Sequence, residues 1–303
     1  MAQGFREIAS GLGFPEGPIA MPDGDVILVE ISARALTRIS RNGRRSVIAN
    51  LGGGPNGAAI GPDGYAYVCN NGGLEFGHWE HYGVNAPVGI AKDYSSGSIQ
   101  RVNLSTGIVE TLYERAGEKP LGSPNDIVFD SHGGFWFTDH SDRRVLYAKP
   151  DGTHIEEVVF PIQAPNGIGL SPDGKTLFVA ETFTCQLWAF DVEGPGRIKA
   201  RPSFFGHNGQ FVYRPAGFKL FDSLAVEATG NVCVATIGDN PGISVVSPSG
   251  VLVEYVETSD LFTTNICFGG GEMKTAYITL SGTGRLLEID WERPGLRLPY
   301  GNL

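Results

Sequence analysis

Short apolar runs separated by glycine-containing turns recur along the whole chain. Residues 26–29, 65–68, 135–138 and 177–179 are such runs, and a glycine stands shortly before each of them. Because glycine tolerates the positive φ of a tight turn, the pattern predicts strand, tight turn, strand in each unit. Further apolar runs, such as residues 35–39 and 242–246, add a third and a fourth strand. The repeated element is therefore expected to be a four-stranded antiparallel unit.

A sequence motif recurs six times, and each copy begins with a polar residue near the start of the first strand of its unit. In five copies a glycine follows that polar residue by eight positions, at Gly24, Gly64, Gly133, Gly174 and Gly230. Six such units fill 303 residues, which predicts an all-β, six-bladed β-propeller that occupies residues 1–303 as a single domain. We expect residues 5–9 to complete the last blade and close the ring, with residues 296–300 as the competing candidate.

Composition and charge narrow the classes of partner. The chain has 41% hydrophobic and 18% charged residues, a net charge of −10, and no run of Lys or Arg. This balance argues against nucleic acid or an anionic membrane surface and favours a cation or a neutral small molecule. No segment approaches the ~18 apolar residues of a membrane span and no signal-peptide core is visible, so we expect a cytoplasmic protein. The sequence carries no indication of oligomeric state.

The six repeated polar residues are the candidate functional residues. They open the innermost strands and are therefore expected to gather at one mouth of the central channel. They are Glu16, Asn56, Asn125, Asn166, Asp222 and Asn265. All offer side-chain oxygens and two are carboxylates, an inventory that hard cations such as Ca²⁺ prefer over the nitrogen and sulfur ligands of zinc. The alternative is that Asn and Asp only make turns before strands.

These motifs resemble those of the senescence marker protein, gluconolactonase and luciferin-regenerating enzyme family, over nearly the whole chain. The resemblance is carried by Glu16 in Pro-Glu-Gly-Pro, Asn125 in Ser-Pro-Asn-Asp, Asn166 in Pro-Asn-Gly-Ile and Asp222 in Phe-Asp-Ser-Leu-Ala-Val. It implies a six-bladed propeller that holds one divalent ion through these four residues, Ca²⁺ first, with Zn²⁺, Mn²⁺ or Mg²⁺ as alternatives. Asn56 and Asn265 are then rim or supporting residues near the substrate.

The resemblance also implies lactone hydrolysis. A bound cation would polarise the ester carbonyl, and Asp222 lies at the motif of the family's general base. Animal gluconolactonases carry an arginine where this chain has Ser123, so the resemblance does not imply specificity for aldonolactones. The Ser-Pro-Asn-Asp motif is more similar to that of bacterial lactonases in the family, which act on varied lactones. Two alternatives stay open: a phosphotriesterase-like hydrolase in which Asp222 attacks directly, and a non-enzymatic propeller that binds a partner.

An insertion at residues 70–97 follows the second copy of the repeat and is rich in aromatic and histidine residues. Trp79 and His81 would suit a lid that covers the channel mouth and contacts substrate. The alternative is that these side chains pack the insertion onto an outer blade surface. His140, at the end of a predicted second strand, is a further candidate for the rim of the substrate pocket.

Overall fold

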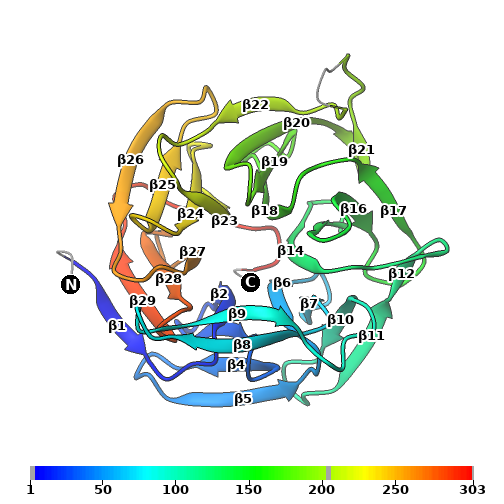
Figure 1. Ribbon diagram of the computed structural model, residues 1–303. Coiled ribbons are helices and arrows are strands. Elements are labelled where there is room, and N and C mark those ends of the chain that lie inside the picture. Colours follow the sequence, from blue (N-terminus) through cyan, green and yellow to red (C-terminus); the bar gives the residue numbers. More distant parts are fainter. Residues whose placement is uncertain (1–3, 203–205, 302–303) are drawn as a thin grey trace.

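The computed structural model describes residues 4–202 and 206–301, and these form six antiparallel sheets arranged as blades around one axis (Figure 1). The predicted six-bladed propeller with four strands per blade is confirmed. From the axis outwards, the first blade contains β2 (Pro15–Ala20), β3 (Val26–Glu30), β4 (Ala35–Ile39) and β5 (Arg45–Asn50). The second contains β6 (Pro55–Ile60), β7 (Ala66–Asn70), β10 (Ser98–Val102) and β11 (Val109–Tyr113). The third contains β14 (Pro124–Phe129), β15 (Phe135–Asp139), β16 (Arg144–Ala148) and β17 (Ile155–Val159).

The remaining blades follow the same order with two variations. In the fourth blade, β18 (Pro165–Leu170), β19 (Thr176–Glu181) and β20 (Gln186–Gly194) are followed by β21 (Arg197–Ile198) and β22 (Gln210–Tyr213), which both pair with β20. The fifth contains β23 (Leu220–Val226), β24 (Val232–Ile237), β25 (Gly242–Val246) and β26 (Leu252–Glu257). The sixth contains β27 (Thr263–Gly269), β28 (Thr275–Leu280), β29 (Arg285–Asp290) and β1 (Arg6–Ala9). Two small hairpins lie outside the blades, β8 (Leu74–Trp79) with β9 (Val84–Ile90) and β12 (Arg115–Ala116) with β13 (Lys119–Pro120).

The first turn of the repeat depends on its glycine. The five repeated glycines all have positive φ, between the 67° of Gly174 and the 91° of Gly230. A side chain at such a position would strain the backbone, because the left-handed region is favourable mainly for glycine. The fixed offset from the polar residue to the glycine therefore sets where each inner strand turns back.

The ring is closed by the N-terminal strand, as predicted. Strand β1 pairs antiparallel with β29, with Arg6 opposite Glu288 and Glu7 opposite Leu287. Residues 296–300, the competing candidate, form no strand and instead line the central channel beside the far ends of the inner strands. Closure by a strand from the opposite end of the chain leaves no open edge between the first and last blades.

Aromatic side chains fill the space between neighbouring blades. Tyr67 of the second blade is fully buried and contacts Phe129 and Phe135 of the third, with ring centroids 5.0 and 5.8 Å apart. Such packing of large side chains fixes each blade against the next, and with it the position of the inner strands.

The insertion forms the β8–β9 hairpin, which lies in front of the first blade in the view of Figure 1. Val84 and Ala86 on β9 of the hairpin are buried, Phe76 packs on Phe14 at 5.1 Å, and the Asn85 amide donates to the carbonyl of Gly282 at 2.8 Å. Phe14 leads into β2 and Gly282 joins β28 to β29. The aromatic side chains of the insertion therefore pack it onto the first and sixth blades.

In the described part of the chain no helix is long and apolar enough to cross a membrane. The expectation that no targeting segment precedes the first strand depends in part on residues 1–3, which lie outside the described residues.

Candidate functional site

All six inner strands begin at the same end of the propeller, and their repeated polar residues lie there together. Each of these strands has an irregularity in its pairing with the second strand of its blade, at or next to the polar residue. A β-bulge at this point turns the polar side chain out of the alternating pattern of the strand. We call this end of the channel the mouth.

Close approach of the inner strands depends on small residues after the polar ones. A Cβ added to Gly17 would lie 2.6 Å from the Asn56 carbonyl oxygen, and one added to Gly57 would lie 2.5 Å from that of Asn125. Neither contact is sterically allowed, so glycine at these positions lets neighbouring strands bring their polar side chains together.

Glu16 is buried at the mouth and is held by the neighbouring blade. Its Oε2 accepts hydrogen bonds from the Gly17 amide and from Asn265 Nδ2, both at 2.7 Å, and only 4% of the residue is exposed. Asn265 Oδ1 accepts from the Ile266 amide at 2.8 Å, so both ends of this amide are used in fixing Glu16. Burial raises the pKa of Glu16, against the lowering effect of these hydrogen bonds.

Asp222 and Asn166 form the second half of the site. Burial raises the pKa of Asp222 well above its ordinary value, the charge of Glu16 adds to this, and the Asn166 side chain opposes it. Asn166 Nδ2 donates to Thr182 Oγ1 at 3.1 Å, whereas its Oδ1 is buried without a hydrogen-bond partner. A buried acceptor without a donor is costly, and the carboxylates of the buried Glu16 and the half-buried Asp222 repel each other. A cation placed among these oxygens would relieve both.

The residues present therefore fit a divalent oxygen-seeking ion. Across residues 4–202 and 206–301, no three His, Cys, Asp or Glu side chains gather so that they could hold a metal ion by themselves. An ion at the mouth would need amide oxygens in addition to Glu16 and Asp222. Asn125 and Asn166 lie on the two inner strands that precede Asp222 and can supply them.

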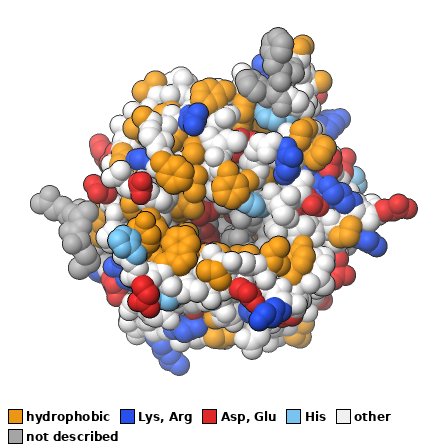
Figure 2. Space-filling model, viewed as in Figure 1, with side chains coloured by type: hydrophobic (Ala, Val, Ile, Leu, Met, Phe, Trp, Pro, Cys, Tyr) orange, Lys and Arg blue, Asp and Glu red, His pale blue; other side chains and the backbone are white. Residues whose placement is uncertain are grey.

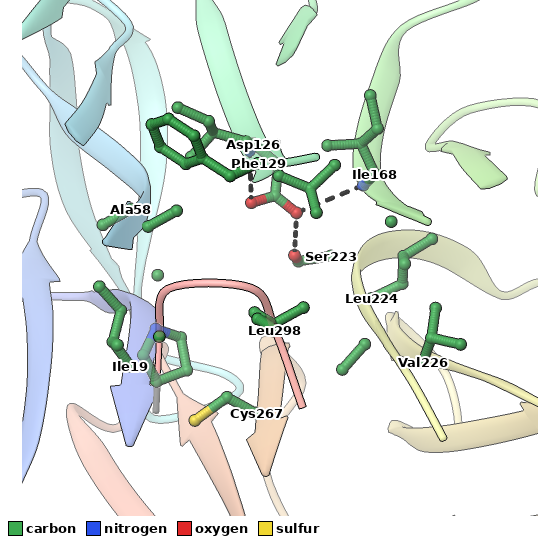
Figure 3. Close-up of a pocket in the computed structure, with 18 of the residues that line it drawn as sticks. Ile19, Ala58, Asp126, Phe129, Ile168, Ser223, Leu224, Val226, Cys267 and Leu298 are labelled. Carbon is green, nitrogen blue, oxygen red and sulfur yellow. Dashed lines mark hydrogen bonds between the residues drawn. The ribbon is translucent and has the colours of Figure 1, made fainter. Parts of the chain in front are cut away.

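A third carboxylate below the mouth was not identified from the sequence. Asp126 points into the channel, where its Oδ2 accepts a 2.5 Å hydrogen bond from Ser223 Oγ and a longer one from the Ile168 amide (Figure 3). Burial raises the pKa of Asp126 to about 6, against these hydrogen bonds. The sequence does contain a sign of this site. The residue after the repeated polar residue is glycine in the copies of Glu16, Asn56 and Asn166, whereas Asp126 and Ser223 occupy that position in two others.

A second repeated feature supports the ends of the inner strands. Glu30, Asn70 and Asp139 each follow the polar residue of their blade by 14 positions, and Glu181 follows Asn166 by 15. Each accepts a hydrogen bond from a backbone amide two or three positions before that polar residue, from Gly13, Gly54, Gly122 with Ser123, and Gln163 respectively. We call these four residues the strand-end clamps. Their fixed spacing was visible in the sequence, but their partners were not.

The other predicted rim residues are spread unequally around the mouth. The His140 amide donates to the Ser123 carbonyl at 3.0 Å, so these two residues lie together, close to Asn125. Burial lowers the pKa of His140, whose Nδ1 has no hydrogen-bond partner. Trp79 packs on Phe262 at 5.8 Å, while His81 is exposed and contacts Tyr82. Asn56 is buried on β6.

The chain is a six-bladed propeller whose mouth gathers carboxylate and amide side chains, and comparison with known proteins gives its family. Residues 14–282 match the SMP-30/gluconolactonase/LRE-like region, so the chain belongs to that family. A gluconolactonase of Zymomonas mobilis is 22% identical over 90% of this chain and 78% of its own length. Lactonase drp35 of Staphylococcus haemolyticus is 34% identical, but the match spans 38% of this chain and only 35% of that lactonase.

Solved structures share the fold at low identity. A calcium-binding protein, regucalcin, from Agrobacterium tumefaciens superposes with a TM-score of 0.74 at 16% identity, covering 96% of this chain and 95% of its own. The family and the propeller fold predicted from the motifs are thus confirmed. Distant homologues of the chain are lactonases and gluconolactonases.

Proposed function

We propose that this protein is a divalent-cation-dependent hydrolase that opens a lactone to its hydroxy acid, with Ca²⁺ as the preferred ion. The observation that carries the proposal is the arrangement at the mouth. The carboxylates of the buried Glu16 and the half-buried Asp222 repel each other there, and the Oδ1 of Asn166 is buried without a partner. The membership of the family, whose named relatives include a lactonase and a gluconolactonase, supports the same activity.

Glu16, Asn125, Asn166 and Asp222 would hold the ion. When bound, it would supply Lewis-acid polarisation of the lactone carbonyl. Glu16 is already held on Oε2 by Asn265 and Gly17, which leaves its other oxygen available. Asn265 is thus proposed to orient Glu16 rather than to touch substrate.

Asp222 is proposed as the general base. Its carboxylate would take a proton from a water molecule as the water oxygen forms a bond to the carbonyl carbon. The ring C–O bond then breaks, and the proton passes to the departing alkoxide to give the hydroxy acid.

The rim residues are proposed to contact the rest of the lactone. Ser123 and His140 lie side by side near Asn125, and Asn56 lies on the inner strand next to it. Trp79 lies on the hairpin, which we propose covers part of the mouth. His81 is exposed at the tip of the same hairpin and is proposed as a further contact for the substrate.

The test is hydrolysis of a lactone panel by chelator-treated protein, with and without added calcium, followed by acid release at constant pH. We expect turnover only with the ion. Asp222→Asn should lose at least about 100-fold in kcat, the lower range for a general base, while Asp290→Asn on an outer strand should not. Tight metal binding without turnover of any lactone would overturn the proposed reaction and turn attention to phosphotriesters. Loss of both would leave only a binding scaffold.

A further inference from the structure

Large hydrophobic side chains surround the mouth. Figure 2, which has the view of Figure 1, shows hydrophobic side chains around the central hollow and acidic ones in its depth. Loops that join second to third strands, and links that lead into inner strands, lie on this face because the inner strands begin here. Phe183 lies on the loop between β19 and β20 and is 70% exposed, and Phe218 lies on the link into β23 and is 65% exposed. Trp79 of the hairpin is 40% exposed.

Phe183 lies beside the polar part of the rim. Its ring contacts that of His140 edge-on with centroids 5.8 Å apart. The His140 amide is hydrogen-bonded to Ser123, two residues before Asn125. Burial lowers the pKa of His140 and so favours the uncharged imidazole on this side of the mouth.

Phe218 lies on the link into β23, four residues before Asp222 in the sequence. It stands over the β24–β25 loop, where a Cβ added to Gly238 would lie 3.7 Å from Phe218 Cε1. On the link into the neighbouring sixth blade, Phe262 backs Trp79 and in turn packs on Phe14 at 5.6 Å. The aromatic rings therefore come from separate blades, and Phe183 and Phe218 present most of their surface to solvent.

Single exposed hydrophobic residues are common, but several around one polar centre indicate a binding surface. We infer that the substrate is a hydrophobic lactone, whose ring carries an alkyl or aryl substituent that contacts Phe183 and Phe218. This inference builds on the proposed lactonase activity. An aldonolactone presents hydroxyl groups on most of its ring carbons, and phenylalanine rings can form no hydrogen bonds to replace those that these groups make with water. An alkyl or aryl group instead gains by leaving water.

The experiment compares three six-membered lactones with the calcium-loaded protein: unsubstituted δ-valerolactone, pentyl-substituted δ-decalactone and δ-gluconolactone. δ-Valerolactone releases a primary alkoxide and the other two release secondary ones, so kcat/KM for each lactone is compared relative to its own uncatalysed rate of hydrolysis. We expect δ-decalactone to exceed δ-valerolactone by at least about tenfold, and δ-gluconolactone to be the poorest. Phe183→Ala and Phe218→Ala should each lower kcat/KM for δ-decalactone by about tenfold and for δ-valerolactone by less than about twofold.

Phe211→Ala is the matched control, since Phe211 is 53% exposed but lies on the outer strand β22. This substitution should leave kcat/KM unchanged for both δ-decalactone and δ-valerolactone. Preference for δ-gluconolactone, or an equal loss on all three lactones in the rim variants, would overturn the inference while leaving the lactonase standing. Failure of the calcium-loaded protein to hydrolyse any of the three, or other lactones, would instead refute the proposed function.

Discussion

Removal of the Asp139 carboxylate tests whether the strand-end clamps hold the site in place. Asp139 is fully buried and accepts hydrogen bonds from the Gly122 and Ser123 amides at 3.1 and 2.7 Å. It also accepts from Arg144 Nε at 3.1 Å and Nη2 at 3.0 Å, and Arg144 is itself only 1% exposed. Asp139→Ala would leave a buried guanidinium and two amides short of an acceptor.

The expected loss is large because both charges are inside the protein. Removing one partner of a buried ion pair costs about 3–5 kcal/mol in the free energy of unfolding. Arg144 keeps Asp142 at 3.0 Å as a partner, which is 28% exposed, so we expect the lower part of that range. The amides of Gly122 and Ser123 lead directly into Asn125, and calcium affinity should fall by about tenfold as well. Urea unfolding and calcium titration calorimetry measure the two effects.

Glu157→Gln provides the control. Glu157 also faces Arg144, at 3.6 Å, but is 38% exposed, so its loss should cost less than about 1 kcal/mol. Asp139→Asn, which keeps the size of the side chain, should lie between the two and provides a measurable variant if Asp139→Ala fails to fold. Equal stability of Asp139→Asn and Glu157→Gln, with unchanged calcium affinity, would refute the role of the clamp.

Three further predictions concern the mouth and the channel. Calcium at 100 times its Kd should raise the free energy of unfolding by about 2.7 kcal/mol and a chelator should reverse this, while an unchanged unfolding curve would argue against the metal site. Asn265→Ala removes a hydrogen-bond donor to the buried Glu16 carboxylate and should lower the free energy of unfolding, measured in urea without added metal, by about 1.5–3 kcal/mol. A loss of less than about 0.5 kcal/mol would contradict that role. Because burial raises the pKa of Asp126 to about 6, the folded protein holds this proton more tightly than the unfolded chain, so its contribution to stability falls as pH rises from about 4 to 6. Asp126→Asn should therefore gain up to about 3 kcal/mol relative to the parent between pH 4 and pH 7, and parallel stability curves would refute the assignment.

Local chemistry along the chain determined the blades. Residues 35–39 and 242–246 were predicted as strands and are β4 and β25. Each unit has an apolar run, a glycine at a turn and a second apolar run, and these features act through residues close in sequence. The same repeat placed Glu16 and Asp222 at equivalent positions in different blades. Once the fold is a ring, equivalent positions must meet at one end of the channel.

The tertiary structure decided what each of these residues contacts. Asn265 holds Glu16 across 249 positions of sequence, because ring closure brings the last inner strand beside the first. The sequence assigns no role to Asp126 beyond its place next to Asn125. In the structure its side chain enters the channel and accepts a hydrogen bond from Ser223, 97 positions away. The strand pattern could not predict this, since a bulge at the mouth breaks the alternation that normally assigns each side chain to a face.

The position of the insertion was likewise decided by packing. Its aromatic residues were consistent with a lid and with attachment to an outer surface, because hydrophobic side chains favour any apolar surface that is available. The surface available was the one formed by Phe14 and Phe262, on links into two neighbouring inner strands at the mouth. Turns and strands follow from interactions between nearby residues, whereas the partners of a buried charge or an aromatic ring depend on which distant segments the closed ring brings together.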